Sequence, residues 1–267
     1  MFDQKEFTIL KAFVSKKTYE QIISEKNFKL NFWQNLLFKK LLKKRQKGIP
    51  LAYLLKNKDF FSLNFFVNKN VLIPRPDTEI LVEKVLELIS QYTKENNFLI
   101  DIGTGSACIP ISILKNTDGI EKAFASDISK KALKIAKKND RKYQTQINFL
   151  KGNLLLPFLK KKLDLKNINL FLTANLPYLT LEQFKNETSI QAEPKKALIA
   201  KENGLYLYKE LFKQIKKIKA KNIFIFCEID PTQTSEITKI IQNNFSNITI
   251  NIKKDYSGLD RVVYFKI

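Results

Sequence analysis

The spacing of apolar residues divides the chain into a front part and a longer remainder. Throughout residues 1–57 apolar side chains recur every three or four positions, which is the period of an amphipathic helix. The longest run is LNFWQNLLFKKLLKKRQ, in which the spaced apolar residues are Phe32, Leu36, Leu37, Leu41 and Leu42. This pattern predicts a small helical bundle whose aromatic side chains, Trp33 included, pack in the core.

Two pairs of phenylalanines follow shortly after this bundle. The stretch DFFSLNFFVN at 59–68 has aromatic runs on both sides of Ser-Leu-Asn, a pattern that predicts a β-hairpin. We expect the hairpin to lie in a linker, residues 58–75, that joins the helical domain at 1–57 to a second domain at 76–267.

From Pro74 onward short apolar runs alternate with longer amphipathic segments. The apolar runs predict strands at 97–102, 122–127, 147–152, 168–174, 222–229, 247–254 and 261–267. The amphipathic segments predict helices at 77–92 (with Asp77 as its N-cap), 107–116, 129–140, 202–218 and 232–245. Such alternation predicts an α/β protein with a doubly wound, mostly parallel, seven-stranded sheet of the Rossmann-like kind. The last two strands, joined only by DYSGLD, should pair antiparallel.

Composition excludes several kinds of chemistry. The 267 residues include no histidine, which excludes Ser-His-Asp triads, histidine acid-base catalysis and histidine metal sites. The two cysteines, Cys108 and Cys227, lie far apart in apolar runs, which predicts buried free thiols, and no metal-ligand spacing is present. Because the start of the chain lacks a signal-peptide pattern and no apolar run approaches the roughly 20 residues of a membrane span, we expect a cytoplasmic protein.

The formal net charge of +21 would attract phosphate whatever the fold. The lysines are spread over the whole chain, however, beside abundant Asn, Ile and Phe. This distribution favours compositional drift over a basic patch, so direct nucleic-acid binding is not required.

The first candidate site is DIGTGSA at 101–107, where a predicted strand turns directly into a helix. Its two glycines allow a ligand to lie against the turn beside the helix N-terminus. Asp127, at the end of the next strand, is placed to accept both hydroxyls of a ribose, and Asn153, after the third strand, to bond an adenine. A nicotinamide fingerprint would need Gly or Ala at Cys108, so the spacing better suits S-adenosylmethionine. The predicted cofactor-binding residues are Asp101, Gly103, Thr104, Gly105, Ser106, Ala107, Asp127, Asn153 and Asn175.

The second candidate site is the sequence Asn175-Leu176-Pro177-Tyr178, which follows the strand at 168–174. In a doubly wound sheet this fourth strand lies beside the first, so both sites should face one crevice. The Asn175 side chain and the Leu176 backbone, placed by the rigid Pro177, offer two carbonyl acceptors beside the Tyr178 ring. Such a pocket recognises a planar NH2 group, of adenine or of a carboxamide, and makes its nitrogen a better nucleophile toward a methyl sulfonium. A simple proline turn would leave the coincidence with DIGTGSA unexplained.

With these motifs the chain resembles the class I S-adenosylmethionine-dependent methyltransferases that act on amino groups. More specifically, it resembles the release factor glutamine methyltransferase family at GIPLAYL (48–54), LIPRPDTEILVE (72–83), EPKKAL (193–198), the Gly204 turn and DYSGLDRVV (255–263). The resemblance is continuous from about residue 48 to 267, and RPDTE is its sharpest marker.

This resemblance implies methylation of the N5 amide of the glutamine in the Gly-Gly-Gln motif of peptide chain release factors. It further implies that Arg75, Glu193 and Pro194 help residues 175–178 to bind the substrate, and that residues 1–57 hold the body of the release factor. We expect a monomer that acts without a membrane.

Two positions depart from the family pattern within the sites. Leu176 stands in place of the first proline of Asn-Pro-Pro-Tyr, and Ala107 in place of the third glycine of the cofactor loop. Because only the backbone carbonyl of Leu176 is needed, we expect activity to be retained.

Two other functions remain open on the sequence alone. An adenine-N6 methyltransferase of DNA or RNA would share the NH2 pocket and use the positive charge, with the base flipped into the crevice. This function would not explain the RPDTE stretch or the helical domain at 1–57. A ribosome- or RNA-associated protein with a degenerate methyltransferase fold is the non-enzymatic alternative, and the intact Asp127 and Asn175 argue against it.

Overall fold

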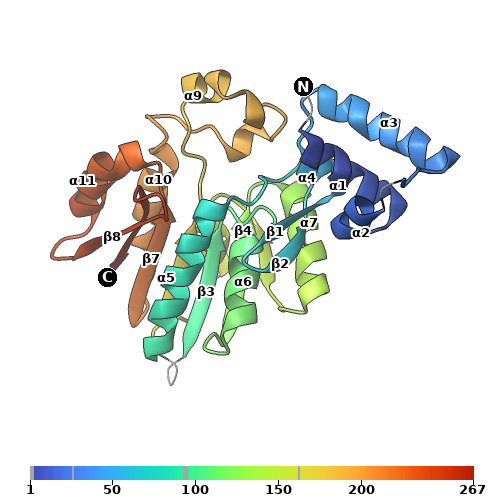
Figure 1. The fold of residues 1–267 in the computed structure, drawn as a ribbon. Helices are drawn as coiled ribbons and strands as arrows, with labels where there is room; N and C mark the ends of the chain where they lie inside the picture. The colour runs from blue at the N-terminus through green and yellow to red at the C-terminus, as the bar shows by residue number, and fades with distance from the viewer. Residues whose placement is uncertain (1–2, 26, 93–95, 162) are drawn as a thin grey trace.

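The N-terminal part of the chain is helical, and the later part forms a large sheet with helices around it (Figure 1). The computed structural model describes residues 3–25, 27–92, 96–161 and 163–267. Within these ranges the chain forms a helical bundle, a two-stranded hairpin and a seven-stranded sheet. None of the helices in these ranges combines the length and the apolar character that crossing a bilayer requires.

The front helices form the bundle that the apolar spacing predicts. Both α2 and α3 begin with a capping box, made by Thr18 with Gln21 and by Asn31 with Gln34, which satisfies backbone N–H groups at each helix start. A cluster of buried side chains holds the helices together: Leu10, Val14, Phe38, Leu41 and Leu54. The helices are α1 Gln4–Ser15, α2 Tyr19–Ser24, α3 Phe32–Gln46 and α4 Leu51–Leu55.

One face of α3 contradicts the sequence prediction. Phe32 and Trp33 are each 74% exposed, and Leu36 and Leu37 are also exposed, so the prediction that Trp33 packs in the core is wrong. The helix buries Phe38 and Leu41 toward its neighbours in the bundle, which covers only one side of it. The uncovered apolar residues therefore face water.

The two phenylalanine pairs form the hairpin that their pattern predicts. Strands β1 Asn57–Phe60 and β2 Leu63–Phe66 pair antiparallel around a two-residue turn. Asn139 of helix α7 (Lys130–Tyr143) fixes this hairpin to the sheet, because its side chain donates to the Phe66 carbonyl and accepts from the Phe66 N–H.

The large sheet has the strand order β5-β4-β3-β6-β7-β9-β8. Its first five strands are parallel, whereas β9 runs antiparallel to both of its neighbours, as predicted for the last two strands. The strands are β3 Asn97–Ile102, β4 Lys122–Asp127, β5 Asn148–Lys151, β6 Asn169–Ala174, β7 Asn222–Glu228, β8 Ile250–Lys254 and β9 Asp260–Lys266. The predicted α/β class and doubly wound, mostly parallel sheet are therefore confirmed.

Helices cover both faces of this sheet. One core packs the sheet against α8, α10 and α11, and the other packs it against α5, α6 and α7. The helices are α5 Glu79–Ile89, α6 Cys108–Asn116, α7 Lys130–Tyr143, α8 Leu156–Lys161, α9 Leu181–Asn186, α10 Tyr206–Ile215 and α11 Thr234–Asn244, with 3-10 turns at Pro76–Thr78, Ser90–Tyr92, Thr188–Ile190, Lys195–Ala197 and Pro231–Gln233. The predicted free thiols, Cys108 and Cys227, are buried in these cores.

Two predicted helix starts are wrong. Asp77 is not an N-cap, because it lies inside the 3-10 turn Pro76–Thr78 that leads into α5, and its carboxylate faces Arg261. The helix predicted at 202–218 begins only at Tyr206, because the preceding residues from 202 to 204 have positive φ and cannot continue a helix.

Candidate active site

The turn after β3 is fastened to the end of β4. The N–H groups of Gly103 and Thr104 both donate to the Ser126 carbonyl, at 2.9 and 3.0 Å. The Gly105 N–H donates to Asp127 Oδ2 at 3.0 Å, and Ser129 N–H donates to the other carboxylate oxygen at 2.7 Å. These bonds orient Asp127 at the carboxyl edge of the sheet, and each of its oxygens keeps a lone pair for a further donor. Burial raises the pKa of Asp127 above its usual value.

Only one of the two carboxylate oxygens of Asp101, at the end of β3, accepts a hydrogen bond of good geometry. Its Oδ1 accepts a hydrogen bond from the Thr173 hydroxyl at 2.7 Å. Within the described part of the chain its Oδ2 and the buried hydroxyl of Thr104 make no hydrogen bond of good geometry, although Thr104 lies near enough to Asp101 to lower the pKa of that carboxyl. Burial raises the pKa of Asp101 to about 7. Since buried polar atoms are nearly always hydrogen-bonded, these two are candidates for contact with a polar ligand.

The remaining predicted cofactor residues lie around this turn. Ser106 and Ala107 are buried, and Ala107 has a left-handed backbone with φ of 63° at the start of α6. Asn153 lies just beyond the edge strand β5, where its side chain is exposed. Its backbone carbonyl accepts from the Leu156 N–H at 3.1 Å, which holds the turn.

The two predicted sites meet in space. Strands β3 and β6 are parallel neighbours with Ile102 opposite Ala174, so the turns that follow them emerge side by side. A Cβ atom at Gly103 would lie 3.0 Å from the Leu176 Cδ2 atom, which shows how closely the two turns pack. The sequence prediction that both turns lie at one edge of the sheet is therefore confirmed.

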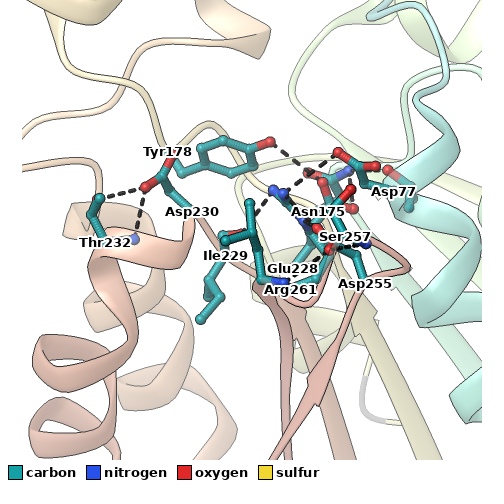
Figure 2. A network of polar contacts seen from close by, with 12 residues as sticks. Asp77, Asn175, Tyr178, Glu228, Ile229, Asp230, Thr232, Asp255, Ser257 and Arg261 are labelled. Carbon is teal, nitrogen blue, oxygen red and sulfur yellow. Dashed lines mark hydrogen bonds and ion pairs between the residues drawn. The ribbon is translucent and has the colours of Figure 1, made fainter.

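Hydrogen bonds determine which way the side-chain amide of Asn175 points (Figure 2). Its side-chain N–H2 donates to Glu228 Oε2 at 2.7 Å and to the Thr78 hydroxyl at 3.1 Å. No donor among the described residues bonds to Asn175 Oδ1 or to the Leu176 carbonyl. These are the two acceptors that the sequence assigns to the pocket.

Glu228 is a site residue that the sequence analysis missed. It ends β7, is 1% exposed, and accepts a hydrogen bond from the Tyr178 hydroxyl on its Oε1 at 3.4 Å. Burial raises the pKa of Glu228 to about 7, although a hydrogen bond from Thr78 and the charge of Arg261 oppose this shift. The signal was available: a carboxylate inside the apolar run NIFIFCEI at the carboxyl edge of the sheet.

Buried polar side chains brace the Asn175 turn from behind. The fully buried Tyr208 hydroxyl donates to the Glu228 carbonyl and accepts from the Leu176 N–H at 3.4 Å. The Gln233 side chain donates to the Tyr178 carbonyl at 3.0 Å. A Cβ at Gly204 would lie 1.9 Å from that same carbonyl oxygen, so this close approach requires glycine.

The sequence is similar to known proteins over most of its length. The release factor glutamine methyltransferase of Dictyoglomus turgidum is 36% identical over 230 residues, covering 84% of this chain and 78% of that protein. That of Mycoplasma mycoides subsp. mycoides is 36% identical over 259 residues, covering 95% and 89%. The chain belongs to the release factor glutamine methyltransferase family.

Two further comparisons agree with a methyltransferase. A family model described as a methyltransferase domain matches residues 82–169. The crystal structure of the N-terminal domain of human METTL16 in complex with SAH matches with a TM-score of 0.58 at 17% identity, covering 99% of this chain and 98% of that one. At this identity the likeness shows the fold alone, and the fold is that of a methyltransferase.

The RPDTE stretch at 75–79 lies beside the Asn175 turn. Thr78 contacts the Asn175 amide, and Asp77 lies 3.5 Å from the Arg261 guanidinium of β9. The stretch is thus fastened to the ends of both β6 and β9.

Arg75, the first residue of this stretch, lies against Glu193. They form an ion pair with each other, and the buried Glu193 also accepts from the Ile73 N–H at 2.9 Å. Pro194 follows directly and starts the short turn Lys195–Ala197. Within the described residues no hydrogen bond joins these side chains to Asn175. Their predicted contact with the substrate stays a prediction.

Proposed function

We propose that this methyltransferase transfers a methyl group from S-adenosylmethionine to the N5 amide of the glutamine in the Gly-Gly-Gln motif of peptide chain release factors. The observation that carries the proposal is the polarity of the pocket: Asn175 turns its N–H2 toward Glu228 and Thr78 and leaves its carbonyl free. A pocket with free acceptors selects an NH2 donor, which a glutamine side chain offers. The names of the similar proteins support the same substrate.

The residues around the Gly103 turn fit the proposed cofactor. Asp127 presents a carboxylate at the end of β4, suited to the two hydroxyls of a ribose. The unpartnered Oδ2 of Asp101 and hydroxyl of Thr104 suit the charged amino acid end of the molecule. When bound, S-adenosylmethionine supplies a methyl group attached to a positively charged sulfur.

The chain's own residues prepare the glutamine nitrogen. Asn175 Oδ1 and the Leu176 carbonyl accept its two protons, which holds the nitrogen in place for attack on the methyl group and raises the electron density of the amide. The same two acceptors stabilise the positive charge that develops on that nitrogen as the methyl group is transferred. An N-protonated amide is strongly acidic, so its surplus proton leaves without a dedicated base, in keeping with a chain that has no histidine.

The test is a methyl-transfer assay with labelled S-adenosylmethionine and, in parallel, purified release factor, duplex DNA and ribosomal RNA. We expect label in the release factor, and none in a variant of it that has glutamate in place of the Gly-Gly-Gln glutamine. Label in DNA or RNA instead would favour the adenine methyltransferase, and cofactor binding without any transfer would favour a non-enzymatic protein.

We further propose that residues 1–57 recognise the release factor and that residues 58–75 join them to a catalytic domain at 76–267. Support comes from the uncovered face of α3, where Phe32 and Trp33 pack edge to face with 5.3 Å between ring centroids and are largely exposed. Exposed apolar groups that lie together are typical of a surface that binds a partner.

The double substitution of Phe32 and Trp33 by serine tests this role. Because two large apolar side chains would be lost from the interface, we expect KM for the release factor to rise about tenfold. Methylation of a short Gly-Gly-Gln peptide should not change. Ile252→Ser, which removes an exposed apolar side chain from strand β8, is the matched control. An unchanged KM in the double variant would show that this face does not bind the release factor.

A further inference from the structure

The Asn175 side chain has two orientations of equal shape, and only one of them suits the reaction. A rotation of 180° exchanges its oxygen and its nitrogen and would turn an NH2 group, instead of a carbonyl, toward the substrate. Two donors would then face each other, so a glutamine NH2 could not bind. Something in the protein must therefore determine which way the amide points.

Glu228 makes one of the two orientations of the Asn175 amide more favourable than the other. Its Oε2 lies 2.7 Å from the Asn175 nitrogen, and an ionised carboxylate can only accept hydrogen bonds. In the rotated amide the Asn175 oxygen would occupy that position, placing two oxygen lone pairs against each other in a site that is almost fully buried. Thr78 acts in the same sense, because its hydroxyl donates its one proton to Glu228 and can therefore only accept from Asn175.

We propose that Glu228 is a positioning residue that holds the Asn175 carbonyl toward the substrate amide and increases its negative charge. This inference rests on the proposed function. The increase arises because a short bond from an amide N–H to a carboxylate shifts electron density to the amide oxygen, and this shift is larger where water is excluded. Glu228 itself is held by the Tyr208 hydroxyl at its backbone carbonyl and by Tyr178 at its side chain.

Ionisation of Glu228 is what makes the orientation obligatory. A protonated carboxyl can donate to the rotated amide, so the preference weakens as the pH falls through the pKa of about 7. The titratable and charged groups that act on Glu228 from the surrounding elements are Asp77, Cys108, Tyr178, Tyr208 and Arg261. Asp101, at the cofactor turn, also has a pKa of about 7. We therefore measure kcat at saturating cofactor, so that titration of Asp101 does not change the fraction of protein with cofactor bound.

The first test is a double-mutant cycle between Glu228→Gln and Asn175→Ala, with kcat measured at saturating cofactor and release factor. Glutamine keeps the shape of Glu228 but can face Asn175 with either its oxygen or its nitrogen. We expect Glu228→Gln alone to lower kcat about 10- to 100-fold, and to change it less than about twofold when Asn175 is already alanine. Glu210→Gln, a charge removal on the outer side of α10, is the matched control and should leave kcat unchanged. Equal losses in both backgrounds would overturn the positioning role.

The pH profile provides a readout that general loss of structure would not imitate. Between pH 6 and 8.5 we expect kcat of the parent to rise as Glu228 loses its proton and then level off. The Glu228→Gln variant should lack this rise, because it has nothing to titrate at that position. An identical rise in both proteins would contradict the inference.

A spectroscopic test needs no activity and so separates this inference from the proposed function. The side-chain amide resonances of Asn175 are identified in nitrogen-15 spectra by their loss in Asn175→Ala. We expect one of its two protons to shift between pH 6 and 8 in the parent and to stay constant in Glu228→Gln. If no release factor is methylated but this shift is seen, the proposed function fails and the orientation by Glu228 stands. If the parent methylates release factor and no shift is seen, the inference about Glu228 fails.

Discussion

The two turns that meet at the carboxyl edge of the sheet are completed in opposite ways. Around Asn175 every donor of the side-chain amide is engaged by the protein itself, through Glu228 and Thr78. Around Gly103, by contrast, the protein leaves Asp101 Oδ2 and the Thr104 hydroxyl buried without a partner. The protein thus orients the Asn175 amide before any ligand arrives and leaves only acceptors for the substrate, whereas at the Gly103 turn it leaves a carboxylate oxygen and a hydroxyl for the ligand.

This difference matches the work that each turn is proposed to do. A group that stabilises a transition state is most effective when it is held in place beforehand, because no free energy is then spent on orienting it during the reaction. A binding site has another requirement, since affinity comes from contacts that the ligand adds. Substitutions at the Asn175 turn should therefore affect kcat, and substitutions at the Gly103 turn should affect cofactor affinity.

The largest effect is expected for Asn175→Ala. Removal of one preorganised acceptor at a developing charge should lower kcat about 100- to 1000-fold. The dissociation constant of the cofactor should change much less, because the bonds made by Asp127 and the Gly103 turn remain. Steady-state kinetics with release factor and calorimetry with the cofactor measure the two quantities separately. If Asn175→Ala methylated the release factor at the parent rate, the turn would be a structural proline turn and not a catalytic pocket.

Asp127→Ala should show the opposite pattern. Loss of charge-assisted hydrogen bonds to a ribose should weaken cofactor binding by about 1.5 to 3 kcal/mol, which is roughly 10- to 150-fold. At saturating cofactor, kcat should change far less than in the Asn175 variant. Asp127→Asn keeps an acceptor and separates the effect of charge from that of shape, and Asp118→Ala on an exposed loop is the control. Equal cofactor affinity by calorimetry would remove Asp127 from the site.

A third test uses the stability of the two buried carboxyl groups. The pKa of Glu228 and that of Asp101 are both raised to about 7 by burial. A group with a raised pKa in the folded state contributes stability that is full below its unfolded pKa, near 4, and is lost as the pH rises toward 7. The unfolding free energy of the parent should therefore fall over this range.

Glu228→Gln removes one of these two groups and stays neutral at every pH. We expect it to be more stable than the parent at pH 8 by about 1 to 3 kcal/mol, and the difference to disappear below pH 5. Thermal or denaturant unfolding at both pH values measures this, with Glu210→Gln, at a partly exposed position on α10, as control. A variant that is both less active and more stable would show that the ionised carboxylate is retained for orientation of Asn175. Lower stability at pH 8 would mean that its bonds outweigh the cost of burying the charge.

Local patterns and the geometry of parallel sheets account for what the sequence predicts correctly. The inner strands β3, β6 and β7 are apolar runs of suitable length that are almost wholly buried, and this pattern is what predicts them. The meeting of the two turns follows because β3 and β6 are neighbours and the carboxyl ends of parallel strands share an edge. Neither inference depends on knowing how particular side chains pack.

Errors arose where packing between distant segments decides the outcome. Nothing in α3 alone tells which apolar face the rest of the bundle covers, so Trp33 was assigned to the core and lies at the surface. Asp77 has the right residue type for an N-cap, but its carboxylate faces Arg261, nearly 200 residues later in the chain. The sequence marks Glu228 only as a carboxylate in an apolar run, and its contact with Asn175 follows from the pairing of β6 with β7.

The smallest effect is expected for Ala107→Gly. Ala107 has a φ of 63°, a left-handed conformation that costs an alanine about 1 kcal/mol and a glycine almost nothing. Its methyl group is fully buried, however, and removing it costs about 0.8 kcal/mol, besides the greater freedom that glycine gives to the unfolded chain.

These opposing terms nearly cancel, so the unfolding free energy of Ala107→Gly should lie within about 1 kcal/mol of the parent. The cofactor dissociation constant should also change less than about threefold, because the partners that await the cofactor, Asp101 and Asp127, keep their places. Ala107→Val is the contrasting variant: a branched side chain at positive φ in a filled core should destabilise the protein by several kcal/mol. A large loss of cofactor affinity in the glycine variant would mean that this turn, like the one at Asn175, depends on being held rigid before its ligand binds.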